Sequence, residues 1–197
     1  MRRLASLLHD RRAASAAEFA LVLPLFILLL FGIIDAGRYM WTVNRAEKAA
    51  QMGVRMAVVT DYVSSAIDDS YIGACSTPLG QGDPIPASCF STITCSKSGG
   101  TVSCTSGTAN ATAFNRVLVR ARRFLPEIQD GNIQIIYSPS GLGYAGDPNG
   151  PDVAPLVTVR LSGISFNPIV TLALASFGLP EVRSSLTFED GIGSVSN

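Results

Sequence analysis

The chain has 197 residues and a formal net charge of zero; 47% of its residues are hydrophobic and only 15% are charged. Soluble domains usually carry about 25% charged residues, so part of this chain is not expected to face water. The one histidine, His9, lies in the N-terminal tail, which leaves the rest of the chain without the usual general base and commonest metal ligand. We therefore expect no enzyme, no metal site and no cofactor, and the zero net charge gives no basis for a nucleic-acid partner.

An uncharged apolar run extends from Phe19 to Ile34 and contains Pro24. At roughly 1.5 Å per residue it spans about 24 Å as a helix, slightly less than a hydrocarbon core, so the helix should extend beyond it. Because arginines precede the run, the positive-inside rule places the N-terminus in the cytoplasm; they are Arg2, Arg3, Arg11 and Arg12. We expect a single-pass signal anchor in a cell inner membrane, with the lipid bilayer as a partner and the C-terminal part periplasmic.

The alternative to an anchor is a secretory signal peptide that is removed after the apolar run. The candidate cleavage sites are poor, because IIDAG places large isoleucines and a charged aspartate just before Ala36. Beyond the run, Asp35 and Arg38 are spaced to pair at i,i+3. Tyr39 and Trp41 are aromatic residues of the kind that favour a membrane interface. The sequence therefore favours an uncleaved helix that leaves the membrane near these residues.

The helix is expected to continue to about residue 60 as an alanine-rich segment. Small or apolar residues recur there at seven-residue spacing and form a seam like the a and d positions of a coiled coil. A partner element can approach closely along such a seam, and that partner is either the chain's own globular part or another subunit; both can hold on different stretches. The seam residues are Ala36, Tyr39, Val43, Ala46, Ala50, Gly53 and Ala57.

Glu18 stands at the start of the apolar run. An ionisable group at membrane depth is costly, so it is a functional hypothesis by default. The alternative is that Glu18 lies at the level of the lipid headgroups and pairs with Arg11 or Arg12.

The segment RRAASAAEFALVLPLFILLLFGIIDAGRYMWTVNRAEKAAQMGVRMA combines a basic tail, small residues, Glu-Phe, an apolar run with an early proline, an acidic residue, Gly-Arg and an alanine-rich helix. As a whole it closely resembles the N-terminal segment of the TadE-like family of pilus assembly proteins, in the tight-adherence (Flp) branch of type IV filament systems. The resemblance covers residues 11–59. It implies a structural membrane protein whose partners are pilus machinery proteins: the platform, the prepilin peptidase and other pilins or pseudopilins.

Some members of that family are pseudopilins that a prepilin peptidase cuts on the cytoplasmic side of the apolar run, with a glutamate at the fifth position after the cut. The resemblance therefore implies a cut between Ala13 and Ala14 and an assembly role for Glu18. The usual residue before the cut is glycine, where this chain has Ala13, so an uncut signal anchor is the alternative. In a cleaved form, the charged α-amino group of Ala14 would pair with Glu18 of a neighbouring subunit in a homo- or hetero-oligomer.

All four cysteines follow the anchor, in a stretch rich in Gly, Ser and Thr: Cys75, Cys89, Cys95 and Cys104. An oxidising compartment favours two disulfides, for which three connectivities exist. We favour Cys95–Cys104, because ITCSKSGGTVSC predicts two short strands around a Gly-Gly turn, and this leaves Cys75–Cys89. A zinc site with four cysteines is a weak alternative, since no C-x-x-C pair is present.

The remaining residues predict one amphipathic helix at 112–125, strands at 132–138, 156–161 and 182–189, and a short apolar helix at 168–177 that packs on the sheet or on the membrane surface. On the first helix, a basic stripe is more typical of a solvated face than of an anionic partner; it consists of Arg116, Arg120 and Arg123.

The loop at 139–155 carries two weak motifs. Its glycines match G-x-G-x-x-G after a strand, but DPNGPDVAP follows, which is a poor start for the helix that a dinucleotide site needs, so we reject that interpretation. Three of its side chains offer oxygen ligands for Ca²⁺, but this interpretation is weak because the EF-hand spacing is absent. The glycines are Gly141, Gly143 and Gly146, and the oxygens belong to Asp147, Asn149 and Asp152.

These elements predict an α+β fold, in which a long N-terminal transmembrane helix continues into a small, pilin-like extracytoplasmic domain with an antiparallel sheet. The expected organisation is a basic cytoplasmic leader at 1–13, the transmembrane helix and its continuation at 14–60, a disulfide-braced region at 61–111 and an α+β domain at 112–197. The leading function is that of a minor pilin, a pseudopilin or a membrane assembly factor of a tight-adherence pilus. The alternative is an anchored extracytoplasmic binding or sensor module unrelated to pili.

Overall fold

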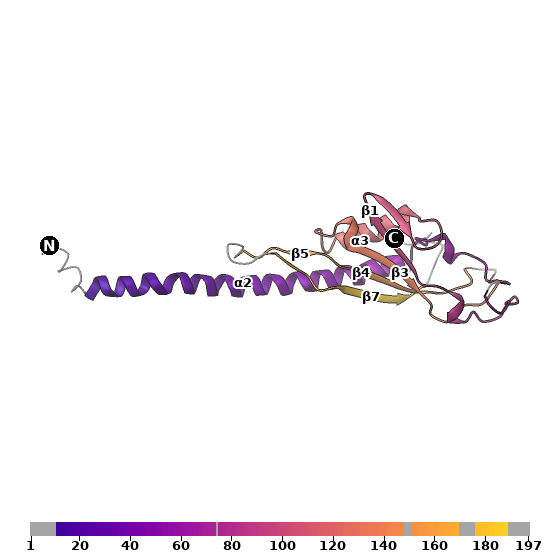
Figure 1. Cartoon of the computed structure of the whole chain (residues 1–197), viewed down its shortest axis with the longest axis horizontal. Coiled ribbons are helices and arrows are strands. Elements are labelled where there is room, and N and C mark those ends of the chain that lie inside the picture. Colours follow the sequence, from indigo (N-terminus) through magenta and orange to yellow (C-terminus); the bar gives the residue numbers. More distant parts are fainter. Residues whose placement is uncertain (1–10, 74, 148–150, 170–175, 189–197) are drawn as a thin grey trace. The chain divides into compact units, whose positions relative to one another are not determined.

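The computed structural model describes residues 11–73, 75–147, 151–169 and 176–188, with side chains from residue 15 onward. The fold is α+β, as predicted: the long helix α2 (Arg11–Ala57) is followed by strands and a second helix (Figure 1). These elements are β1 (Ile93–Ser98), β2 (Thr101–Cys104), α3 (Ala111–Arg122), β3 (Ile133–Ser138), β4 (Leu156–Leu161), β5 (Ser165–Phe166), β6 (Phe177–Gly178) and β7 (Val182–Thr187). Short 3₁₀ helices lie at Ser65–Ile67, Ala87–Cys89 and Asp130–Asn132.

The chain divides into two compact units. The first contains the chain up to Trp41 together with the segment Phe166–Phe177, and the second contains the rest. In the second unit, a sheet of five strands has the order β2-β1-β3-β4-β7, and all of its neighbouring strands are antiparallel. Strand β3 shows why one face of this sheet is the core: Ile133, Ile135 and Tyr137 are fully buried, while the residues between them are partly exposed.

Helix α3 begins at a polar cap, because the side chain of Asn110 accepts hydrogen bonds from the N–H groups of Thr112 and Ala113. One face of the helix is buried, and its apolar residues recur at helical spacing; they are Ala113, Phe114, Val117, Leu118 and Ala121. The predicted helix at 112–125 is therefore present, although it ends three residues earlier than predicted.

The second half of α2 also packs on this core. Ala46, Ala50 and Ala57 of the predicted seam are buried. Gly53 lies closest of all: a Cβ placed there would stand 3.2 Å from Val159 Cγ1. Small residues thus let the helix approach α3 and β4, so this stretch of the seam packs on the chain's own domain. Ala36, at the other end of the seam, is exposed.

The predicted hairpin and both favoured disulfides are present. Gly99 and Gly100 both have positive φ, as a tight hairpin turn requires, and Cys95 stands directly opposite Cys104 on the paired strands. These two cysteines form one disulfide, and Cys75–Cys89 is the other.

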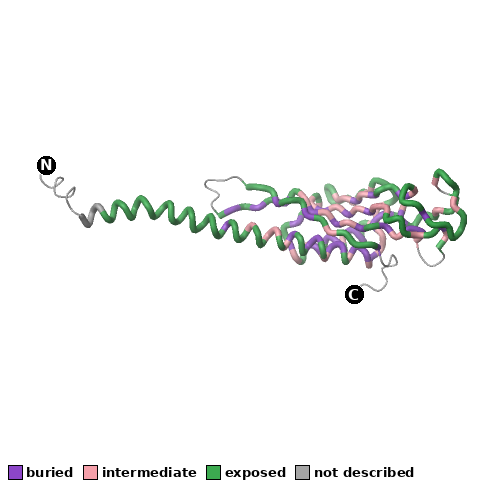
Figure 2. The backbone as a smooth tube through the Cα atoms, turned by 90° about the horizontal axis from the view of Figure 1, so that it is seen from below, coloured by how far each residue is buried: buried purple, intermediate pink, exposed green. Residues whose placement is uncertain are grey.

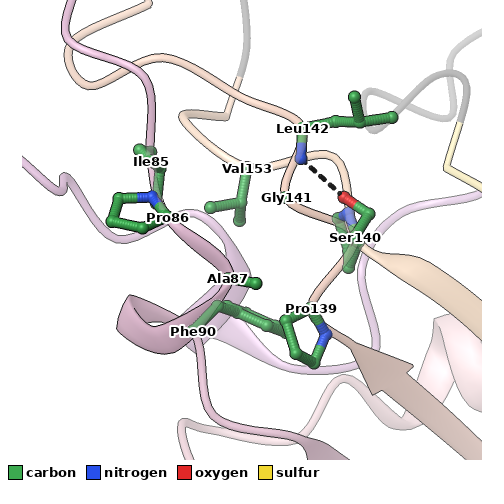
Figure 3. A pocket seen from close by; sticks show the side chains of 10 residues that line it. Ile85, Pro86, Ala87, Phe90, Pro139, Ser140, Gly141, Leu142 and Val153 are labelled. Atoms are coloured by element: carbon green, nitrogen blue, oxygen red, sulfur yellow. Dashed lines mark hydrogen bonds between the residues drawn. The ribbon is translucent and has the colours of Figure 1, made fainter.

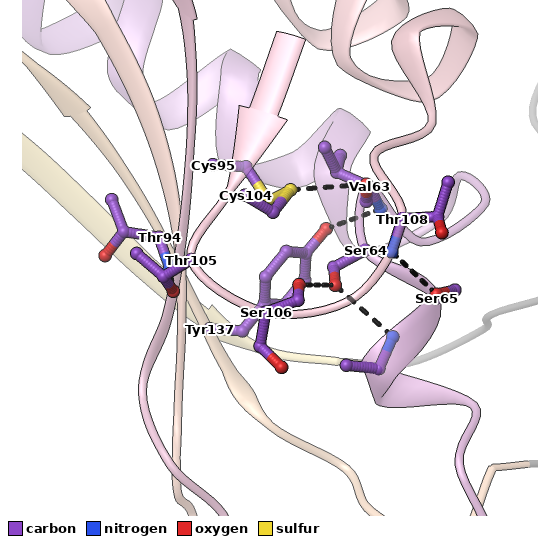
Figure 4. The surroundings of a disulfide bond; sticks show 11 residues. Val63, Ser64, Ser65, Thr94, Cys95, Cys104, Thr105, Ser106, Thr108 and Tyr137 are labelled. Atoms are coloured by element: carbon purple, nitrogen blue, oxygen red, sulfur yellow. Dashed lines mark hydrogen bonds between the residues drawn. A yellow bond between two sulfur atoms is a disulfide. The ribbon is translucent and has the colours of Figure 1, made fainter.

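The Cys95–Cys104 disulfide lies beside Val63, in the segment that follows α2, and Cys104 Sγ is 3.5 Å from the carbonyl oxygen of Val63 (Figure 4). Burial raises the pKa of Tyr137 to about 12, so its hydroxyl stays neutral, and it accepts a hydrogen bond from the N–H of Val63 at 3.2 Å. The hydroxyl of Ser64 donates to the carbonyl of Ser106 at 2.6 Å. The segment that follows α2 is therefore hydrogen-bonded both to β3 and to the chain just beyond the β1–β2 hairpin.

Replacing both Cys95 and Cys104 with alanine should lower the free energy of unfolding by about 2.6 kcal/mol, the loop-closure contribution for their separation of nine residues. Urea unfolding of the full chain in detergent would measure it. Reduction of the wild-type protein under the same conditions is the control and should produce at least the same loss. Unchanged stability of the double variant would show that this disulfide does not brace the hairpin.

The prediction of a helix at 168–177 is wrong for the described residues: Pro168 and Ile169 are not helical, and Phe177 belongs to strand β6, which pairs with β5. Residues 170–175 lie outside the described residues. The physical reason is aromatic packing within the first unit. Tyr39 contacts the rings of both Phe166 and Phe177, with centroids 5.5 and 5.7 Å away, and so holds the two chain segments side by side.

Candidate functional site

The loop at 139–155 is held in place by a buried carboxylate. Asp152 accepts hydrogen bonds from the backbone N–H of Tyr71 at 2.7 Å and of Asp147 at 3.0 Å. Its two oxygens are thus already bound to N–H donors, which is the environment of a structural carboxylate and not of a Ca²⁺ ligand. Asn149, the third residue of the calcium interpretation, lies outside the described residues. Across the described part of the chain, no group of three His, Cys, Asp or Glu side chains could hold a metal ion.

The pKa of Asp152 reflects this environment. Burial would raise it, but hydrogen bonds from the N–H groups of Gly146, Tyr71 and Asp147 and from the side chain of Ser70 outweigh burial and lower it. The carboxylate therefore stays ionised and ties the 71–73 segment to the far end of the loop.

The three glycines of the G-x-G-x-x-G match serve turns. Gly141, Gly143 and Gly146 all have positive φ, and no helix begins in the described residues around them. At Gly143 a Cβ would stand 2.2 Å from the carbonyl oxygen of Asp152, so two backbone segments meet there. The adjoining cavity, between Phe90, Pro139 and their neighbours, has a volume of about 10 Å³ (Figure 3). That is room for about one water molecule, and a dinucleotide does not fit.

The basic stripe on α3 is partly neutralised by the rest of its unit. Arg116 lies 3.4 Å from the carboxylate of Asp61, and the guanidinium of Arg120 lies 5.9 Å from the ring centre of Phe124. Arg123 is exposed. This is the arrangement of an ordinary solvated helix face.

The largest exposed apolar surface among the described residues belongs to α2. Every residue from Phe19 to Ile34 is exposed, with Leu21 and Leu25 at 76% and 70%, and Figure 2 shows this half of the helix in green. Patches of this size on a soluble monomer mark interaction sites. In the described part of the chain, α2 alone is long and apolar enough to cross a membrane, so this surface is the candidate functional site.

Glu18 borders this surface and is exposed on α2. Ala13 and Ala14 lie in the same helix, and the cut between them stays a prediction. The structure describes side chains from residue 15 onward, so the pairing of Arg11 or Arg12 with Glu18 also stays a prediction.

At the other end of the apolar run, Asp35 forms the predicted pair with Arg38, at 2.8 Å. It also has a second partner that sequence reasoning missed: its Oδ1 accepts a hydrogen bond from the backbone N–H of Ile169 at 2.8 Å. The only sequence signal for this contact is that no charged residue occurs between Arg160 and Glu181, a composition that suits a position beside an apolar helix.

Comparison with known proteins adds one finding. No curated protein and no solved structure matches the chain. The model of one protein family, described as TadE-like protein, matches residues 13–55, which is nearly the whole of α2. The N-terminal segment of this chain is therefore TadE-like, as its residues predict.

Proposed function

We propose that this protein is a minor pilin, a pseudopilin or a membrane assembly factor of a tight-adherence (Flp) type IV pilus system, and that it acts by lateral packing of α2 in the inner membrane. One observation carries the proposal: the TadE-like match coincides with the helix whose apolar half is exposed and bears Glu18 at its edge. The proposed role is structural and needs no catalytic site.

The physical basis is the difference between the two halves of α2. From Ala46 onward the helix is covered by its own domain, so it needs no further partner there. From Phe19 to Ile34 every residue is exposed, and a bilayer or neighbouring helices would cover this surface.

Glu18 would supply specificity in this packing. A charged side chain costs about 3 kcal/mol at the bilayer centre on insertion scales, and less near the edge. Pairing with a cation of a neighbouring subunit offsets that cost and fixes the register of the two helices. The α-amino group of Ala14 would be this cation if the leader is cut, and a basic side chain of another subunit would be if it is not.

Replacing Glu18 with glutamine removes the charge at nearly constant volume. We expect the variant to insert normally but to reach cross-linked pilus complexes about tenfold less, a loss of about 1.4 kcal/mol. Quantitative cross-linking in native membranes, followed by immunoblotting, would measure this.

Two variants serve as controls. Glu18→Asp keeps the charge and should restore much of the cross-linking. Glu47→Gln makes the same chemical change at an exposed position of α2 outside the apolar run, and it should have no effect. Equal cross-linking of Glu18→Gln and wild type would remove the proposed role of this carboxylate.

The processing step and the pilus assignment need separate measurements. Intact mass and N-terminal sequencing of the protein from its native membrane would give Ala14 as the first residue of a cleaved pseudopilin and Met1 for a permanent anchor. Co-purification with platform proteins or the prepilin peptidase supports the pilus assignment. Their absence from a stable complex would favour the anchored binding or sensor module instead.

A further inference from the structure

The segment Phe166–Phe177 belongs to the same unit as the apolar half of α2. Its described residues lie along that helix toward the apolar run: Phe166 contacts Tyr39, and Ile169 then contacts Asp35, one helical turn closer to the membrane. Pro168 and Phe177 line a groove of about 360 Å³ together with α2 residues that reach back to Leu28. Strands β5 and β6 pair with each other, and the described residues of this pair and its flanks, 165–169 and 176–178, lie beside the helix where the apolar run ends. We call these described residues the β5–β6 hairpin.

Asp35 marks that level chemically, because it is the first charged residue after the apolar run. It is 8% exposed although it carries a carboxylate. Its Oδ1 accepts hydrogen bonds from Arg38 and from the backbone N–H of Ile169, each at 2.8 Å. A backbone N–H without an acceptor is costly beside hydrocarbon, so Asp35 makes it possible for a hairpin to lie at this depth.

The hairpin also has the composition of a membrane contact. Ile169 and Phe177 are 50% and 43% exposed, and no charged residue occurs between Arg160 and Glu181. Tyr39, whose ring contacts Phe177, is of an aromatic type that gathers at the headgroup level of a bilayer. The ring of Phe166 is held by Tyr39 and by the guanidinium of Arg38, which lies 5.4 Å from its centre.

We infer that the β5–β6 hairpin is a second membrane contact, in which Ile169 and Phe177 enter the outer leaflet of the same bilayer that α2 spans. The inference rests on the membrane anchor in the proposed function. We assign the bilayer as the partner that covers the exposed hairpin residues, because these residues are continuous with the apolar surface of α2. Asp35 sets their depth. Open strand edges do not persist in the hydrocarbon core, so the hairpin lies at the boundary between headgroups and acyl chains.

The test places single cysteines in the full-length protein, labels them with an environment-sensitive fluorophore and reconstitutes the protein in liposomes of phosphatidylethanolamine and phosphatidylglycerol. Ile169→Cys reports the hairpin, and Leu142→Cys is an equally apolar, exposed position in the other unit. The native cysteines are paired in disulfides and do not take label. Ile169→Cys should lose most of its fluorescence to a nitroxide on the acyl chain near the headgroup and be protected from aqueous iodide. Leu142→Cys should behave in the opposite way.

A third label, at Ile27→Cys, reports the membrane insertion of α2 itself and so separates the anchor from the hairpin contact. If Ile27→Cys is quenched by the lipid nitroxide while Ile169→Cys is quenched only by iodide, the anchor stands and the hairpin inference is wrong. If Ile27→Cys also escapes the nitroxide, the anchor fails. Protection of Ile169→Cys that appears only at high protein-to-lipid ratio would mean that a second copy covers the hairpin, which also overturns the inference.

Discussion

Replacing Gly53 with leucine should lower the free energy of unfolding by about 3 kcal/mol, the upper part of the range for an overpacked core. The reason is geometric. Even a Cβ at this position lies 3.2 Å from Val159 Cγ1 and 3.8 Å from both Ala121 Cβ and Val117 Cγ1. A leucine side chain would therefore have to displace α3 or β4, both of which contribute fully buried residues to the core.

A matched variant separates this steric effect from helix propensity. At an exposed position in a helix interior, replacing glycine with leucine stabilises the helix by up to about 1 kcal/mol through intrinsic helix propensity. At Gly37, on the same helix, a new Cβ would meet nothing within 4 Å, so Gly37→Leu should be neutral or slightly stabilising. Guanidinium unfolding in detergent, followed by the far-ultraviolet signal of the sheet, would compare the two. Similar stabilities for both variants would show that α2 does not pack on its domain through Gly53.

The contact at Gly53 also shows which parts of the fold could be predicted from the sequence. The recurrence of small residues along α2 indicated that some element would approach closely, and the residues at 132–138 predicted strand β3. The Gly99-Gly100 turn predicted the hairpin and the favoured disulfide. In each case the signal is local, because a period of 3.6 or 2 or a turn dipeptide is contained in a few consecutive residues. Which element would pack on Gly53 remained open, because that depends on tertiary contacts.

The features that the sequence did not predict depend on contacts between residues far apart in the chain. Asp35 was expected to pair with Arg38, but its bond to the N–H of Ile169 joins positions separated by 134 residues. Asp152 was considered as a weak Ca²⁺ ligand, because a carboxylate in a polar loop has the same composition whether it binds a cation or backbone N–H groups. Local propensity likewise favoured a helix up to Phe177, which instead lies in a strand held by Tyr39.

Asp152→Asn should destabilise the second unit by about 2–3 kcal/mol, as expected for the loss of charge-assisted hydrogen bonds at a buried site. An asparagine keeps one acceptor oxygen, but it would turn an NH₂ group toward the N–H of Tyr71 or of Asp147. One of these donors would then be left without an acceptor. Asp83→Asn is the matched control, because Asp83 is exposed and accepts a hydrogen bond from Gly80 at the surface.

The dependence on pH gives this prediction a second readout. Because the pKa of Asp152 is lower in the folded protein than its ordinary value of 3.8, its contribution is complete above that value and is lost as the pH falls through the folded-state pKa. The wild-type protein should therefore lose stability steeply below about pH 4. The Asp152→Asn variant should be less stable at neutral pH, and its stability should fall less steeply with acid because it lacks the Asp152 carboxylate. Some acid dependence should remain, because the pKa values of Asp130 and Glu181 are also lowered in the folded protein. Parallel stability curves for the two proteins between about pH 2 and pH 6 would show that the ionised carboxylate does not hold the loop.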